Sequence, residues 1–121
     1  MTATILIVDD SRAMRDMLYH SLTEAGFRVV QAQDGVHGVE ILESEKPDVI
    51  ITDINMPRLD GFGFIEAVRC HDICRVTPVL VLTTEIDAEK KQKARMTGAT
   101  GWIIKPFDPA KLVAAIRRIA A

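Results

Sequence analysis

Three carboxylates, one hydroxyl and one ammonium group each stand at the end of a short apolar run of the sequence. In chain order they are Asp9, Asp10, Asp53, Thr83 and Lys105. Carboxylates brought close together repel one another unless a cation neutralises them, and an oxygen-only set of ligands suits Mg²⁺ best. A carboxylate held beside a metal ion and a lysine can act as a nucleophile toward a phosphoryl group. These residue types predict phosphoryl chemistry on an aspartate, provided that the fold brings them together.

Taken singly, each aspartate can also be a turn or helix cap, and Asp10 before Ser11 fits that alternative. A shared site is favoured because all five side chains stand at runs that predict strands. Four runs are β-branched and nearly continuous, which is typical of parallel strands covered on both faces, and a fifth is more mixed. The runs are Ile5–Val8, Phe27–Ala32, Val49–Ile51, Val79–Leu82 and Trp102–Ile104.

Segments with helical spacing lie between these runs. The first has an apolar stripe of Met14, Met17, Leu18 and Leu22, and Gly26 follows where a C-terminal cap belongs. The last begins at a predicted N-cap followed by proline. The other stripes, with that start, are Val36, Val39 and Leu42; Phe62, Ile65 and Val68; and Asp108 and Pro109 before Leu112, Val113, Ile116 and Ile119.

The segment Asp87–Gly98 has strong helix propensity but few apolar anchors. Ala88, Ala94 and Met96 are the candidates. One interpretation is a solvated surface helix. The other is a helix held weakly enough to shift when the molecule changes state.

Strands that alternate with helices predict an α/β fold with a parallel sheet. Right-handed crossovers leave few topologies, and the leading one is a five-stranded parallel sheet of order 2-1-3-4-5, flanked by five helices. Strands 1 and 3 are then neighbours, and ligands bind outside the carboxyl ends of the strands at this switch point. We expect residues 1–121 to form one domain, with no output domain after the fifth helix.

The composition argues against several classes of function. A formal net charge of −2 gives no basic field for nucleic acid. No apolar run approaches the roughly 18 residues of a membrane span, and the N-terminus lacks the features of a signal peptide. We therefore expect a cytoplasmic protein without nucleic-acid binding or membrane insertion.

Two cysteines lie close together, with a histidine beside one of them. Cys70 and Cys74 would share a face if their segment were helical, and His71 lies between them. A tetrahedral zinc site needs four ligands, and no fourth has sensible spacing. Reduced structural thiols are the favoured interpretation, with a metal site or disulfide as the alternative.

Four short motifs occur in a fixed order around the polar residues described above. They are Val8–Ser11, Thr52–Pro57 followed by Gly61, Leu82–Thr84, and Ile104–Phe107. Together they cover the chain and resemble response-regulator receiver domains, which have a flavodoxin-like, CheY-like fold. The stand-alone chemotaxis regulators of the CheY type are most similar, because the chain stops after the fifth helix and carries Asn55 and Glu85.

The resemblance implies a role for each acidic residue. Asp53 would take a phosphoryl group from a histidine kinase and become an aspartyl phosphate. Asp10, Asp53 and the backbone carbonyl of Asn55 would bind Mg²⁺, the implied cofactor. Asp9 would act on the metal through water or share it.

The remaining motif residues would contact the phosphoryl group or tune its lifetime. Thr83 and Lys105 would each pair with a phosphoryl oxygen. The side chains of Asn55 and Glu85 would screen the attacking water. Thr84 stands where a smaller residue is usual, so its bulk would slow access.

A partner-binding face would follow from the same resemblance, along the fourth helix, fifth strand and fifth helix. Trp102 replaces the usual tyrosine or phenylalanine there, and is either a switch residue or a half-buried edge aromatic. Pro106 would follow a cis peptide bond. The basic residues of this face are Lys90, Lys91, Arg95 and Lys111.

The implied function is a monomeric, non-enzymatic response regulator of a two-component system, most similar to those of chemotaxis. Its partners would be a CheA-like histidine kinase or a histidine phosphotransfer protein, a flagellar motor switch protein and a phosphatase. A phosphorelay intermediate or phosphate sink that never contacts the motor is the alternative. An aspartyl phosphohydrolase is disfavoured because Asn55 stands where a second acid is needed. A flavodoxin is disfavoured because Asp9 and Asp10 would repel a cofactor phosphate.

Overall fold

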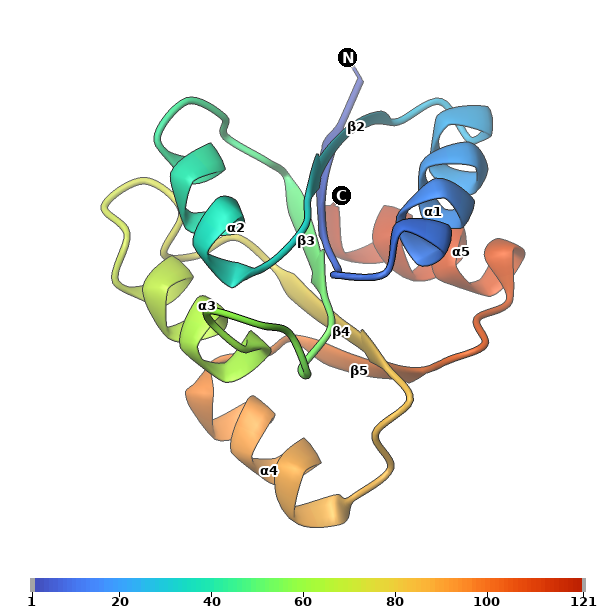
Figure 1. Ribbon diagram of the computed structural model, residues 1–121. Helices are drawn as coiled ribbons and strands as arrows, with labels where there is room; N and C mark the ends of the chain where they lie inside the picture. The colour runs from blue at the N-terminus through green and yellow to red at the C-terminus, as the bar shows by residue number, and fades with distance from the viewer. Residues whose placement is uncertain (1, 121) are drawn as a thin grey trace.

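The computed structural model describes residues 2–120, and the two ends of the predicted domain, Met1 and Ala121, lie outside that range. Strands and helices alternate along the described chain, as predicted (Figure 1). The strands are β1 (Thr4–Val8), β2 (Arg28–Ala32), β3 (Val49–Thr52), β4 (Val79–Thr83) and β5 (Gly101–Ile104). The helices are α1 (Arg12–Glu24), α2 (Gly35–Leu42), α3 (Gly61–Arg69), α4 (Ala88–Thr97) and α5 (Pro109–Ala120).

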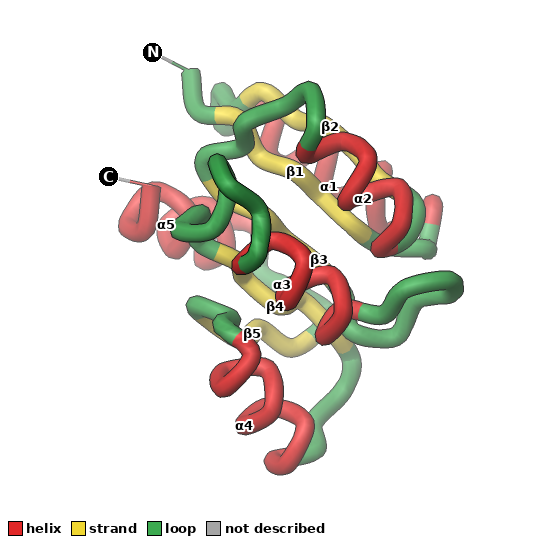
Figure 2. The backbone as a smooth tube through the Cα atoms, turned by 90° about the vertical axis from the view of Figure 1, so that its left-hand side faces the viewer, coloured by secondary structure: helices red, strands yellow, loops and turns green. Residues whose placement is uncertain are grey.

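The five strands form one parallel sheet in the order β2-β1-β3-β4-β5. This confirms the predicted fold and makes β1 and β3 neighbours at the topological switch point. Helices α2, α3 and α4 lie on one face of the sheet, and α1 and α5 lie on the other (Figure 2). Because the strands are parallel, their carboxyl ends all lie at the same edge of the sheet.

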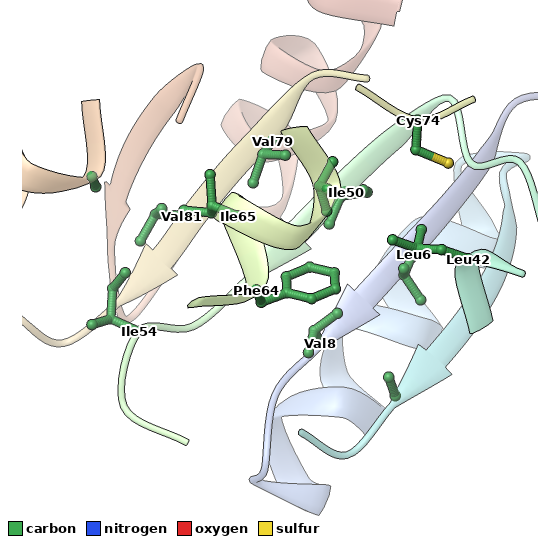
Figure 3. Close-up of a cluster of buried hydrophobic side chains, with 13 residues drawn as sticks. Leu6, Val8, Leu42, Ile50, Ile54, Phe64, Ile65, Cys74, Val79 and Val81 are labelled. Atoms are coloured by element: carbon green, nitrogen blue, oxygen red, sulfur yellow. The ribbon is translucent and has the colours of Figure 1, made fainter. Parts of the chain in front are cut away.

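Both faces of the sheet are buried, which explains why the apolar runs are continuous rather than alternating. In β1, Leu6 and Val8 belong to the core under α2 and α3, whereas Ile5 and Ile7 belong to the core under α1 and α5. Phe64 of α3 lies in the first of these cores, near Val8 (Figure 3).

Helix α1 begins and ends where the sequence predicts. The Ser11 hydroxyl caps its start by accepting from the Met14 N–H, and Gly26 has a φ of 95° just beyond its end. Leu18 and Leu22 are buried, but the prediction that Met17 joins the apolar stripe is wrong. Met17 is 53% exposed because it lies about 100° around the helix from Leu18, at the edge of the buried face.

Helix α4 is the least buried of the helices in the described chain. Asp87 caps its first turn, and Ala94 is its one buried residue. The prediction that Ala88 and Met96 are also apolar anchors is wrong, because both side chains are exposed. The one buried side chain of this helix is small, so packing holds the helix weakly.

The two cysteines are both free thiols. Cys70 is the exposed C-cap of α3, and Cys74 lies in a turn with its side chain in the core. They therefore do not share a helix face, and the structural interpretation fits Cys74. Among residues 2–120, no helix has both the length and the apolar character needed to cross a membrane.

Candidate functional site

The ends of β1 and β3 bring three carboxylates together. Val8 and Thr52 are partners in the parallel ladder, and the Asp53 N–H donates to the Val8 carbonyl at 3.0 Å. The residues that follow these two strands are therefore adjacent. One carboxylate oxygen from each of Asp9, Asp10 and Asp53 lies within 4.8 Å of the others.

Lys105 enters this cluster from the end of β5. Its N–H donates to the Thr83 carbonyl, and its peptide bond to Pro106 is cis, as the resemblance to receiver domains implies. The Nζ donates to Asp53 Oδ2 at 2.8 Å and to Asp9 Oδ2 at 2.9 Å. The Lys105 side chain is 11% exposed, so a nearly buried ammonium group bridges the two carboxylates.

The charges of this cluster depend on one another. Burial raises the pKa of Asp9, although the hydrogen bonds from Lys105 and the Ser11 N–H oppose that rise. Burial by itself would lower the pKa of Lys105, but its hydrogen bonds to Asp53 and Asp9, and their charges, raise it overall. Lys105 is therefore an ammonium at neutral pH, and its charge offsets part of the repulsion among the acids.

The oxygen atoms of the cluster differ in how they are used. Asp53 Oδ1 accepts from the Ile54 N–H at 2.6 Å, and Asp9 Oδ1 accepts from the Ser11 N–H at 2.8 Å. Asp10 is exposed, so the cluster opens to solvent on its side. An oxygen-only donor set with room for water fits Mg²⁺, which keeps several waters and takes one or two carboxylates.

Comparison with known proteins assigns the chain to a family. The family model for the response regulator receiver domain matches residues 5–117. The chain is a member of this family. Receiver domains are phosphoryl-accepting signalling modules that bind Mg²⁺ at an acidic pocket.

Relatives of this receiver domain include both single regulators and longer proteins. A Rhizobium etli protein described as a probable chemotaxis protein CheY is 36% identical over 116 residues, which cover 95% of this chain and 90% of that protein. Response regulator MprA of Mycobacterium ulcerans is also 36% identical, over 98% of this chain, but the match spans only 50% of that protein.

Solved structures show the same fold. Chemotaxis protein CheY4 of Vibrio cholerae matches with a TM-score of 0.93 and 44% identity, covering 98% of this chain and 99% of that one. The receiver domain of the Pseudomonas aeruginosa PAO1 sensor histidine kinase PA1611 matches with a TM-score of 0.91 and 26% identity, covering 99% and 98%. That domain was solved with a magnesium ion coordinated in its active site cleft.

We expect Mg²⁺ to raise the melting temperature of this receiver domain, because the cation relieves repulsion that exists only when the three carboxylates are folded together. At ten times its Kd, the shift should be roughly 5 °C. Asp10→Ala should abolish the shift, as measured by differential scanning calorimetry. Asp16→Ala removes an equal charge from an exposed position on α1 and should keep the shift. A full shift in Asp10→Ala would contradict a metal role for this residue.

In the described part of the chain, the residues at the end of β4 and just after it form no hydrogen bond or ion pair with the three carboxylates. Thr83 is fully buried, and its Oγ1 accepts from the Glu85 N–H at 3.2 Å. The Glu85 carboxylate pairs with Lys90 Nζ at 3.0 Å. Two residues predicted for separate roles, lifetime tuning and partner binding, thus contact each other. Asn55 and Thr84 are both exposed at the loops that border the cluster.

The predicted partner face is assembled only in part. Trp102 is half-buried and packs against the core under α2 and α3. Together with Lys91 and Arg95 it lines a pocket of about 60 Å³ between α4 and β5. Lys111 is exposed on α5 and lines a different hollow, beside Pro106.

Sequence reasoning missed another ion pair, which joins the loop after β3 to the start of α2. Arg58 donates to both carboxylate oxygens of Asp34, at 2.7 Å and 3.0 Å. Asp34 before Gly35 could have been identified as the N-cap of the second helix, which the structure shows it to be. No sequence pattern identifies Arg58 as its partner, because Arg58 lies in a loop without periodicity. Its φ of 68° is seen only in the structure.

Proposed function

We propose that this receiver domain accepts a phosphoryl group on Asp53 from a phosphohistidine, with the whole of residues 1–121 acting as one receiver unit. The observation that carries the proposal is the position of Lys105 Nζ, which lies 2.8 Å from Asp53 Oδ2 at the edge of a three-carboxylate cluster. A nucleophile that is both charge-compensated and held next to metal ligands is suited to phosphoryl transfer.

In the transfer, a carboxylate oxygen of Asp53 attacks phosphorus, and the phosphorus–nitrogen bond of the donor breaks with its electron pair left on the imidazole. Asp9, Asp10, Asp53 and the Asn55 carbonyl would hold Mg²⁺, which when bound neutralises charge on the transferring phosphoryl oxygens. Lys105 supplies a second positive charge to those oxygens. The Thr83 hydroxyl would donate to another of those oxygens, since its contact with the Glu85 N–H uses the hydroxyl oxygen as an acceptor and not its proton.

Water then hydrolyses the aspartyl phosphate and restores the carboxylate. We place Asn55, Thr84 and Glu85 around the path of this water, where they set the lifetime of the phosphorylated state. Asn55 offers no proton for a leaving group, which favours a slow signalling state over steady enzymatic turnover.

We further propose a role in chemotaxis, as a cytoplasmic monomer that a CheA-like kinase phosphorylates and a phosphatase resets. Similarity to CheY proteins over 90% and 99% of their lengths supports this role. The partner would be a flagellar motor switch protein, bound at α4, β5 and α5 through Trp102 and the basic residues Lys90, Lys91, Arg95 and Lys111. A histidine phosphotransfer protein would replace it in a relay or phosphate sink.

Trp102 gives a direct readout of this proposal, because it is the only tryptophan and lies on the proposed face. We expect its fluorescence to change when Mg²⁺ and beryllofluoride are added, and to change again on titration with the motor-switch segment. Asp53→Asn should remove the first change. An activated protein that binds a histidine phosphotransfer protein but not the motor-switch segment would establish the relay instead.

A further inference from the structure

The Asp34–Arg58 pair joins two elements that are far apart in the sequence. Asp34 caps α2, and Arg58 lies in the connection from β3 to α3, which follows the proposed phosphoryl acceptor. The Asp34 side chain is 6% exposed, whereas that of Arg58 is 52% exposed. Figure 1 shows the start of α2 and the β3–α3 connection at the same end of the sheet. The pair therefore connects the β3–α3 loop to the N-terminus of α2.

The start of this loop is already fixed to the site. The Ile54 N–H donates to Asp53 Oδ1 at 2.6 Å, and the Ile54 carbonyl accepts from the Gly61 N–H at 2.8 Å. Ile54 is also buried. Asn55 comes next and is exposed, so its position depends on what holds the rest of the loop.

The far side of the loop is held against α2. A Cβ atom on Gly35 would lie 2.3 Å from the Leu59 carbonyl oxygen, so the loop backbone rests directly on the first turn of α2. Arg58 has a φ of 68°, which few residues other than glycine, asparagine and aspartate adopt without cost. Two donors to one carboxylate fix the direction of the loop as well as its distance from α2.

Both members of the pair are charged at neutral pH. The hydrogen bonds from Arg58, with the His37 N–H, hold the pKa of the Asp34 carboxyl below its ordinary value of 3.8. A second two-donor pair, Arg28 with Glu45, has distances of 2.9 Å and 2.9 Å and starts at the opposite end of the sheet. It provides a matched control for the loss of such a pair.

We propose that Asp34 and Arg58 are a positioning pair for the phosphoryl site. They hold the β3–α3 loop so that the carbonyl and side chain of Asn55 stay at the cluster. Neither residue contacts the phosphoryl group. The proposal rests on the proposed function only in taking Asn55 as part of the site.

Arg58→Asn and Asp34→Asn are the informative variants. Asparagine tolerates the backbone conformation at position 58, and at position 34 it still accepts from the His37 N–H, so both variants keep the local backbone. Arg58→Asn removes both donors of the pair, whereas Asp34→Asn removes its negative charge and the oxygen that accepts from Arg58 Nε. Without metal, we expect faster hydrogen exchange of the 54–60 amides. Calorimetric titration should show Mg²⁺ binding weakened about tenfold, as when a group that orients a metal ligand is lost.

The lifetime of the phosphorylated state should also shift in both variants. The double variant should behave as either single one, because the two residues act through one contact. Arg28→Asn is the control. It should change the midpoint of urea denaturation without changing hydrogen exchange in the β3–α3 loop, Mg²⁺ affinity or the lifetime of the phosphorylated state.

The proposal would be overturned if Arg58→Asn had hydrogen-exchange rates in the loop and a Mg²⁺ affinity within about twofold of the wild-type values. Because position 58 is exposed, Arg58→Asn should fold, and it tests the proposal even if Asp34→Asn fails to fold. Failure of the proposed function has a different signature. In that case wild type would take no label on Asp53, while metal-free exchange would still report whether the pair holds the loop.

Discussion

Asp53→Asn is expected to reduce covalent labelling by acetyl phosphate, or by an autophosphorylated histidine kinase, to background. The amide has no anionic oxygen to attack phosphorus, so the variant lacks the proposed nucleophile. Labelling is measured by intact-protein mass spectrometry under conditions that preserve acyl phosphates. Wild type should take one phosphoryl group in a single turnover.

Asp72→Asn is the matched control, because it makes the same chemical change at an exposed turn away from the cluster. It should label like wild type. Stoichiometric labelling of Asp53→Asn at another residue would show that the acceptor is not Asp53. Continued release of phosphate from a phosphomonoester by the wild-type protein would instead support the hydrolase alternative.

Lys105→Met should have the largest effect on stability. It removes the ammonium that bridges Asp9 and Asp53, whose side chains are 3% and 12% exposed, and leaves two charges nearly buried. Removing one partner of such a pair costs about 3 kcal/mol, a large part of the stability of a domain of this size. Urea denaturation without Mg²⁺ measures the loss.

The loss should depend on pH in a definite direction. Burial already raises the pKa of Asp9, and removing Lys105 raises it further. An acid with a raised folded pKa binds more protons when folded, so the unfolding free energy of the variant should fall as pH rises from about 4 through that pKa. Near neutral pH the deficit should therefore be largest.

Mg²⁺ should restore more stability to Lys105→Met than to wild type, because it supplies the missing positive charge. Lys111→Met is the control, since Lys111 is exposed on α5 and its loss should cost little. A variant as stable as wild type in metal-free buffer would show that the bridge contributes nothing to folding.

The fold and the acidic cluster were predictable because each depends on a strong local pattern. Continuous β-branched runs indicated parallel strands, and Lys105 and the acids each ended such a run. One topology then determined that they meet. The errors concern residues at the edge of a helix's buried face, where apolar spacing predicts burial poorly. Met17 and Met96 are apolar and correctly spaced, but a small shift around the helix puts each in solvent.

Contacts between loops were the part that the sequence could not supply. Arg58 is a polar loop residue with no periodicity, and only the packing of the loop on α2 brings its side chain to Asp34. The pairing of Glu85 with Lys90 depends in the same way on where α4 begins. Such contacts link segments whose relative position emerges only when the whole sheet is assembled.

Helix α4 has ten residues, of which only Ala94 is buried. Substitution at the exposed positions of a helix usually changes stability by less than about 0.5 kcal/mol. This side of the molecule can therefore diverge during evolution almost independently of the chemistry at the strand ends. The proposed partner face can therefore change its specificity, while the proposed acceptor site and the core that supports it remain the same.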